Sequence, residues 1–326
     1  MSPLVKGYDK KKVGIERPFT QLLLLGIMLV LVMFLSIKSP HFLSWNNIRN
    51  ILDHTSIQLI LALGMTFVIS SGGIDLSIGS IVALTGICIG LMLKAGVSVI
   101  ISSVIGLLIA GLLGGINGLI ISKLKIAPFI VTIGSMSLFR GISLVITEGR
   151  PIHGFPPEIT YFAKGDLGKI NPPIILSIFL AILSVFIIKH TKWGQYCLAL
   201  GGNEEALRRV GVPISFYKTT VYIFSGLMAG LTGLIYLSRL NAAEPNAGFM
   251  LESNTIATVI LGGTSMKGGK ASIGGTVIAC LLLGIVRNGL TLLSISSYYQ
   301  QLFIGAVIII SVSISEIRLR RQMQIR

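Results

Sequence analysis

Residues 97–121 read VSVIISSVIGLLIAGLLGGINGLII, a long run without a charged side chain. At about 1.5 Å of rise per residue, a helix of this run is about 37 Å long, which exceeds the roughly 30 Å hydrocarbon core of a bilayer. Residues 19–37 and 76–93 have the same character. Over the whole chain 12% of residues are charged, whereas a soluble domain carries about 25%. We therefore predict an all-α polytopic membrane protein.

The apolar runs divide the chain into about ten predicted transmembrane helices. They are residues 19–37, 55–71, 76–93, 97–121, 126–146, 174–189, 218–238, 254–265, 271–290 and 298–315. The predicted domains are a basic N-terminus at 1–18, a transmembrane domain at 19–315 and a basic C-terminus at 316–326. The span at 254–265 is short and ends in two glycines, so we expect it to be tilted, broken or shielded by neighbouring helices.

Most lysines and arginines fall in segments that share one side of the membrane when the spans alternate. The most basic of these are residues 1–18, 190–217 and 316–326. Since cationic loops stay in the cytoplasm, both termini and the loop 190–217 are predicted to be cytoplasmic. A net charge of +15 suggests nucleic acid binding in a soluble protein, but here the cations orient the chain among membrane lipids. No nucleic acid partner is expected.

The sequence has no arrangement of residues that predicts catalysis or metal binding. Its four histidines are scattered, and residues 263–270 read GTSMKGGK, which lacks the first glycine and the final Ser or Thr of a phosphate loop. Thr264 stands at the glycine position and Ala271 follows Lys270. We therefore expect no enzyme activity, no metal and no nucleotide site in this chain, so any ATP must bind to another subunit.

A glycine-rich segment joins the second and third predicted spans. We single out Gly72, Gly73, Asp75, Ser77 and Gly79 as a cytoplasmic turn with a candidate gating role. Glycine permits a tight reversal with positive φ. The Asp75 carboxylate has two interpretations: it caps the next helix by accepting backbone N–H bonds, or it acts directly in gating.

Two asparagines, Asn117 and Asn288, lie in otherwise apolar predicted spans. An amide in lipid is costly unless it faces protein or water. Each therefore either bonds a neighbouring helix or lines a translocation path. Ionisable groups that could couple transport to protons or sodium are almost absent from the spans, so the energy for any transport is expected to come from a partner.

Two short sequence matches suggest a diverged internal repeat. Gly72-Gly73 with the following Ser-Ile-Gly resembles Gly268-Gly269 with its following Ser-Ile-Gly, and Asn117-Gly-Leu resembles Asn288-Gly-Leu. A true duplication would suit a transporter core, but short matches also arise by chance in such a composition.

Four motifs together resemble the permease subunits of bacterial ABC importers for ribose and related simple sugars. They are SGGIDLSIGS at 71–80, LGGNEEA at 200–206, VILGGTS at 259–265, and NGL at 288–290 followed by SYYQ at 297–300. They occur in the family's order over residues 45–310 or so. Permeases for ribose, xylose, allose and autoinducer-2 are not separated by these motifs.

The resemblance implies a permease of the bacterial inner membrane that works by alternating access. It implies three partners: an ATP-binding cassette subunit that holds ATP and Mg²⁺, a periplasmic or extracellular sugar-binding protein, and a second permease subunit, expected to be an identical copy. A stand-alone secondary sugar carrier is the alternative function, and a membrane scaffold without transport is a third.

The loop 190–217 resembles the segment that docks on the ATPase in this family. Asn203 is a natural N-cap, acidic residues follow it, and arginines precede Gly211 and Pro213, so a short amphipathic helix is predicted. Without the resemblance it would be an ordinary helix at the lipid interface. The candidate coupling residues are Gly201, Gly202, Asn203, Glu204, Glu205, Ala206, Arg208 and Arg209.

Three arginines, Arg140, Arg239 and Arg287, are expected near the outer side of the membrane. The simple interpretation is that their side chains reach the outer interface. Related importers dock acidic side chains of the binding protein on arginines, which makes these residues candidates for such docking.

Overall fold

The computed structural model describes residues 10–165 and 170–296, with isolated positions between 298 and 309. These residues are mostly helical, with only two strands of two residues each, which confirms the all-α prediction. The helices of eleven or more residues are α1 (Lys10–Lys38), α2 (Trp45–Ser70), α3 (Ile78–Lys94), α4 (Val99–Leu124), α5 (Pro128–Thr147), α7 (Pro172–His190), α8 (Lys192–Arg209), α9 (Ile214–Leu240), α10 (Leu251–Leu261) and α11 (Ile273–Leu292). The short elements are β1 (Ile152–His153), η1 (Pro157–Thr160), α6 (Tyr161–Lys164) and β2 (Ala242–Ala243).

In the described residues, seven helices are long and apolar enough to cross a membrane: α1, α2, α4, α5, α7, α9 and α11. Predicted spans correspond to all of these and also to α3 and α10, which are only 17 and 11 residues long. The last predicted span, 298–315, lies outside the continuously described residues. The chain is a multi-pass membrane protein in which two predicted spans are shorter than a bilayer crossing.

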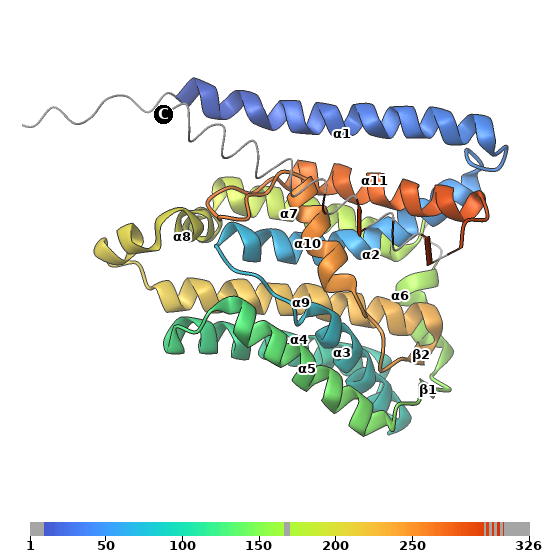
Figure 1. The fold of residues 1–326 in the computed structure, drawn as a ribbon. Coiled ribbons are helices and arrows are strands. Elements are labelled where there is room, and N and C mark those ends of the chain that lie inside the picture. Colours follow the sequence, from blue (N-terminus) through green and yellow to red (C-terminus); the bar gives the residue numbers. More distant parts are fainter. Residues whose placement is uncertain are drawn as a thin grey trace, which may run out of the picture.

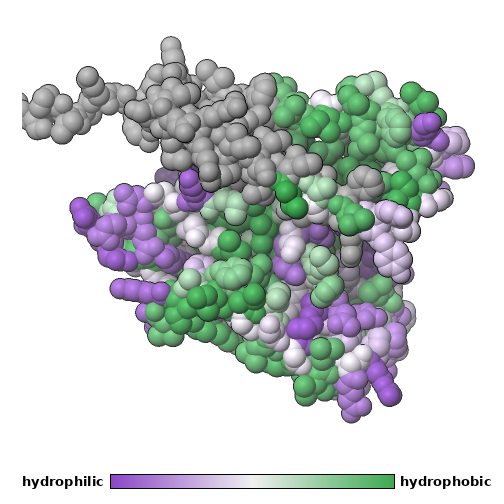
Figure 2. Space-filling model, viewed as in Figure 1, coloured by the Kyte–Doolittle hydropathy of each residue, from purple (hydrophilic) through white to green (hydrophobic). Residues whose placement is uncertain are grey.

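The long helices lie side by side along one direction, with α1 packed on α11 at one edge (Figure 1). We call the end that carries α8 the α8 end, and the end that carries the β1–β2 ribbon the ribbon end. β1 and β2 pair antiparallel, Ile152 opposite Ala243. Figure 2 shows hydrophilic residues gathered at both ends, with a hydrophobic surface over α4 and α5 between them. This distribution is the one expected when a bilayer surrounds the middle of the molecule.

Helices α4 and α9 pack against each other in the core with their backbones in close approach. A Cβ atom added at Gly114 would overlap the carbonyl oxygen of Tyr222, and one added at Gly226 would overlap that of Ala110. The two backbones can approach this closely only because both positions lack a side chain. The many glycines of α4 therefore have a packing role, and the pair forms a fixed wall for the segments that lie against it.

After α2 ends, residues 71–77 do not form a surface turn. They run back into the helix bundle before α3 begins. Gly72, with φ of +83°, lies at the α8 end, while the hydroxyl of Ser225 on α9 donates to the Asp75 carboxylate at 2.9 Å. Ser225 is about 16 Å along α9 from its start, by the helical rise. Residues 71–77 thus run inward beside α9, and α3 begins inside the bundle, which explains its short length.

A second segment enters from the ribbon end. After β2, residues 244–250 run inward, and a Cβ added at Gly248 would overlap the carbonyl oxygen of Gly79. Helix α10 begins directly after this contact and runs toward the α8 end (Figure 1). The bundle therefore contains two short helices, α3 and α10, that start close together near its middle and run in opposite directions. Such irregular backbone is stable at membrane depth only when protein or water shields it.

The two sequence matches that suggested a repeat pair different helices in the structure. The glycine pairs precede α3 and α11, which both run from the α8 end toward the ribbon end. The Asn-Gly-Leu runs lie in α4 and α11, which run in opposite directions (Figure 1). Since α11 cannot be the counterpart of both α3 and α4, the two matches do not belong to one duplication. A diverged repeat stays a prediction.

Candidate functional site

Helix α8 is bent at Asn203, which has non-helical φ and ψ of −161° and 92°. The Asn203 Oδ1 accepts a hydrogen bond from the backbone N–H of Ala206 at 2.9 Å. This bond satisfies one of the unpaired donors at the start of a helix, and it confirms the predicted N-cap. The second part of α8, from Glu204 to Arg209, is therefore a separate short helix that projects at the α8 end.

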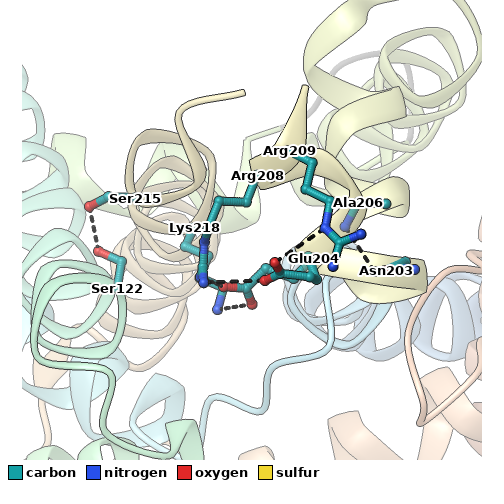
Figure 3. A network of polar contacts seen from close by, with 9 residues as sticks. Ser122, Asn203, Glu204, Ala206, Arg208, Arg209, Ser215 and Lys218 are labelled. Carbon is teal, nitrogen blue, oxygen red and sulfur yellow. Dashed lines mark hydrogen bonds and ion pairs between the residues drawn. The ribbon is translucent and has the colours of Figure 1, made fainter. Parts of the chain in front are cut away.

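The projecting helix carries a network of charged side chains, of which Glu205, Arg208 and Arg209 are exposed and Glu204 is half-buried (Figure 3). Arg208 pairs with Glu204 at 2.9 Å and with Glu205 at 3.4 Å, and Lys218 of α9 pairs with Glu204 at 2.6 Å. The Arg209 side chain is 79% exposed and approaches Glu205 at 3.5 Å. Exposed ion pairs contribute only about 0–1 kcal/mol to stability. These charges are therefore available to a partner at little cost to the fold.

Just before the bend, α8 touches two other segments through backbone atoms alone. The backbone N–H of Gly269 donates to the carbonyl of Ser70 at 2.8 Å. A Cβ added at Gly201 would lie 2.8 Å from the Gly268 Cα and 2.6 Å from the Gly269 nitrogen. We call this contact of residues 70, 201, 268 and 269 the glycine junction. It joins α8 to the end of α2 and to the loop before α11.

The Asp75 side chain lies inside the bundle with no exposed surface. Its Oδ1 accepts from the backbone N–H of Ser77 at 3.0 Å and from the Ser77 hydroxyl at 2.6 Å, and its Oδ2 accepts from Ser225. The bond to the Ser77 N–H, at the start of α3, is of the kind expected of a capping carboxylate. The structure thus places Gly72 and Gly73 at the α8 end, but Asp75, Ser77 and Gly79 deeper in the bundle. Their gating role stays a prediction.

The polar cluster continues from Ser77 to α4 and α5. The Asn117 side-chain N–H donates to the Ser77 hydroxyl at 2.9 Å, and the Ser135 hydroxyl donates to the Asn117 Oδ1. The Tyr222 hydroxyl of α9 donates to the carbonyl of Ile74 at 3.2 Å. Asn117 is completely buried, so it joins helices in this structure. Three helices, α4, α5 and α9, therefore hold the entering segment 71–77 in place.

Asn288 does not join this cluster. It lies near the ribbon end, where its side-chain amide exchanges two hydrogen bonds with that of Asn47 on α2, at 2.8 and 3.0 Å. The two predicted path residues are therefore at different depths, and both make helix–helix hydrogen bonds. A path-lining role for either of them stays a prediction.

The three predicted docking arginines also lie apart. Arg140 donates to the carbonyls of Pro245 and Ala247 at 2.6 and 2.9 Å and so holds the segment 244–250. Arg239 contacts the His54 ring at 2.9 Å and the Asp53 carboxylate at 3.5 Å, near the ribbon end. Arg287 lines a cavity described below. Arg287 is exposed, whereas Arg140 and Arg239 are half-buried and already bonded within the chain. A docking role for any of the three stays a prediction.

The sequence did not single out Tyr222, Ser225 or the segment 244–250. A serine among the glycines of α9 was a usable signal, since a hydroxyl in an apolar span needs a partner. The segment 244–250 reads EPNAGFM, and its Pro, Asn and Gly are typical of loops. Nothing in this composition shows that the loop enters the bundle.

Comparisons with known proteins agree with the motifs. The family described as branched-chain amino acid transport system / permease component matches residues 47–312. The chain is 43% identical to the ribose import permease protein RbsC of Haemophilus influenzae over 290 residues, which cover 87% of this chain and 90% of that protein. It is 41% identical to RbsC of Bacillus subtilis over 285 residues, with 87% and 88% covered. It is 37% identical to the D-allose transport system permease protein AlsC of Escherichia coli over 290 residues, with 89% of each covered. No solved structure matches the chain.

Proposed function

Because the chain belongs to the family of branched-chain amino acid transport system permease components, we propose that it is the membrane-spanning permease subunit of an ATP-driven sugar importer in a bacterial inner membrane. The cargo is a simple sugar of the ribose type. The observation that carries the sugar assignment is the identity of 37–43% with ribose and allose permeases over most of both chains. The permease moves the sugar, and the ATPase partner binds and hydrolyses ATP with Mg²⁺.

The α8 end is proposed to face the cytoplasm and to dock on the ATPase subunit. The projecting helix Glu204–Arg209 offers both signs of charge on a short, capped element, which suits a groove in a partner of matching charge. The lysines of this end, among them Lys123, Lys125 and Lys192, support the orientation. Since α1 ends at the ribbon end, its start and the N-terminus then lie in the cytoplasm, and the C-terminus is proposed to lie there too.

The ribbon end is proposed to face the periplasm or the cell exterior and to receive the sugar-binding protein. Arg239 and Arg287 are the candidates for contact with acidic side chains of that protein, while Arg140 already donates to two carbonyls of its own chain. A second, identical permease subunit is proposed to complete the pore. These assignments follow from the family's mode of assembly and from the positions of the charged residues.

Reconstitution tests the proposed function. The purified chain is placed in lipid vesicles with its cognate ATPase and loaded binding protein, and uptake of radiolabelled ribose, allose and arabinose is measured. Uptake of at least one of these sugars is expected only when ATP, ATPase and binding protein are all present. Uptake by this chain alone, without ATP, would establish the stand-alone carrier instead.

Reversing the two arginines of the projecting helix is expected to uncouple the complex. In the Arg208→Glu, Arg209→Glu variant the charge presented to the ATPase changes sign, so ATP-dependent uptake should fall at least tenfold. New like-charge pairs within the helix cost only about 0.2–0.5 kcal/mol each, so the melting temperature of the purified permease should stay within a few degrees.

Arg150→Glu is the matched control, because Arg150 is an exposed arginine at the ribbon end. It should leave the amount of ATPase that co-purifies with the permease unchanged, a measurement that does not involve the binding protein. Equal uptake by the α8 variant and the wild type would exclude the projecting helix as the docking element.

A further inference from the structure

A cavity of about 460 Å³ opens on the ribbon side of the segment 244–250. Helices α9 and α11 supply Tyr236 and Arg287 to its wall, and the segment and the first turn of α10 supply Asn246, Phe249 and Asn254. The volume falls within the roughly 300–1,000 Å³ typical of small-molecule sites. The cavity is set apart from the Asp75 cluster, and none of the motif residues discussed above except Arg287 lines it.

The lining has the chemistry that a neutral polyhydroxylated molecule requires. The side-chain amides of Asn246 and Asn254 make no hydrogen bond within residues 21–165 and 170–296, so they are free to donate and accept. Phe249 and Tyr236 offer aromatic faces for the C–H surface of a sugar ring. Glu244 and Arg287 bring one charge of each sign, so the cavity has no excess charge that would favour an ionic ligand.

The inner boundary of the cavity is a closed backbone contact. Gly248 lies against Gly79 so closely that a Cβ on either would overlap a carbonyl oxygen of the other. Arg140 holds the same segment by donating to the carbonyls of Pro245 and Ala247. A molecule in the cavity can therefore go no further toward the α8 end until the segment 244–250 moves. The contact between Gly79 and Gly248 thus bounds the cavity on one side, while Tyr236, Leu240 and Arg287 line it on the side of the ribbon end.

We propose that this cavity is a transmembrane binding site for the monosaccharide, in which Asn246 and Asn254 hydrogen-bond its hydroxyl groups before the contact between Gly79 and Gly248 opens. The inference rests on the proposed function, and it adds a ligand site and its residues to it. Binding here is expected to be weak compared with that of the sugar-binding protein, because the site has two side-chain amides and few other polar groups. The site guides the sugar across the outer half of the membrane.

The test compares sugar movement with ATP hydrolysis in the full complex. In the Asn246→Ala, Asn254→Ala double variant, the number of sugar molecules moved per ATP hydrolysed should fall at least tenfold. The ATPase activity stimulated by loaded binding protein should stay within twofold, since α8 and the Asp75 cluster are untouched. An unchanged transport ratio would overturn the inference, as would a parallel loss of both activities in a variant that is still folded.

A labelling experiment provides a second test that does not depend on removing the amides. Ser253→Cys places a thiol on the cavity wall, and Ala95→Cys places one at the ribbon end outside the cavity. A charged, impermeant thiol reagent added from the ribbon side should block uptake at least tenfold in the first variant and leave it unchanged in the second. The native thiols are controlled by the unsubstituted protein, in which Cys197 and Cys280 are buried and Cys88 is half-buried; the same reagent should leave its uptake unchanged.

The outcomes separate the two proposals. If the wild-type complex moves none of the three sugars, the proposed function fails, and this inference fails with it. If the wild-type complex transports a sugar but the labelled Ser253→Cys variant transports it equally well, only the cavity assignment is wrong. Transport that is blocked by labelling and uncoupled in the double variant supports both.

Discussion

Replacing Gly226 with valine is expected to remove most of the folded protein from the membrane. A Cβ at this position would overlap the carbonyl oxygen of Ala110 and lie 3.2 Å from the Gly114 Cα. Both neighbours are backbone atoms, so no side-chain rotation relieves the clash, and α4 and α9 must separate. Overpacking of a core usually costs about 1–3 kcal/mol, and the loss here should be larger because a whole helix pair shifts. The amount of monodisperse protein extracted in detergent should fall at least fivefold.

Gly26→Val is the matched control for this change. Gly26 also lies in the middle of an apolar helix, α1, but no atom of the rest of the structure lies within 4 Å of a Cβ added there. The same substitution should therefore leave the yield of monodisperse protein nearly unchanged. Equal yields from the two variants would show that α4 and α9 are not in the contact described.

Replacing Asp75 with alanine is expected to lower both stability and transport strongly. The change leaves the Ser77 N–H and the hydroxyls of Ser77 and Ser225 without their acceptor in a site that has no exposed surface. An unsatisfied buried polar group costs about 1–3 kcal/mol, and several kcal/mol is a large part of the roughly 5–15 kcal/mol that stabilises a typical domain. The melting temperature should drop by roughly 10 °C or more, and ATP-dependent uptake should fall at least tenfold.

Asp75→Asn separates the hydrogen bonds from the charge. Asparagine keeps the Oδ1 acceptor, and the Ser225 hydroxyl can rotate to accept from its side-chain N–H. We therefore expect this variant to recover most of the melting temperature. If it melts as early as the alanine variant, the charge and not the hydrogen bonding of Asp75 stabilises the segment 71–77.

The sequence predicts correctly those elements that are determined by residues close together in the chain. The helices α4, α5, α9 and α11 follow from apolar runs that are long enough for a bilayer. The bend at Asn203 follows from a capping residue and the acidic residues after it, and the structure has the predicted capping bond. In both cases the residues that decide the structure are neighbours in the chain, so no knowledge of tertiary contacts was needed.

The depth of the two entering segments could not be read from the sequence. Residues 72–75 were predicted to form a turn at the membrane surface, yet Asp75 is completely buried. Its position depends on residues distant in the chain: Ser225 donates a hydrogen bond to its carboxylate, and Asn117 donates to the neighbouring Ser77 hydroxyl. The start of α2 was also missed, because Asn47, Asp53 and His54 read as a loop. There the helix begins at Trp45, and the Ser44 hydroxyl accepts from the Asn47 N–H at 3.3 Å.

The glycine junction has a mechanical consequence. Flexible side chains between two elements can absorb a small displacement by changing rotamer, whereas closely packed backbone cannot deform in this way. At Gly201, Gly268 and Gly269 there is no such cushion. A displacement of α8 by even about an ångström must therefore be passed directly to the end of α2 and to the loop before α11, since no side chain lies between the three backbones to take it up.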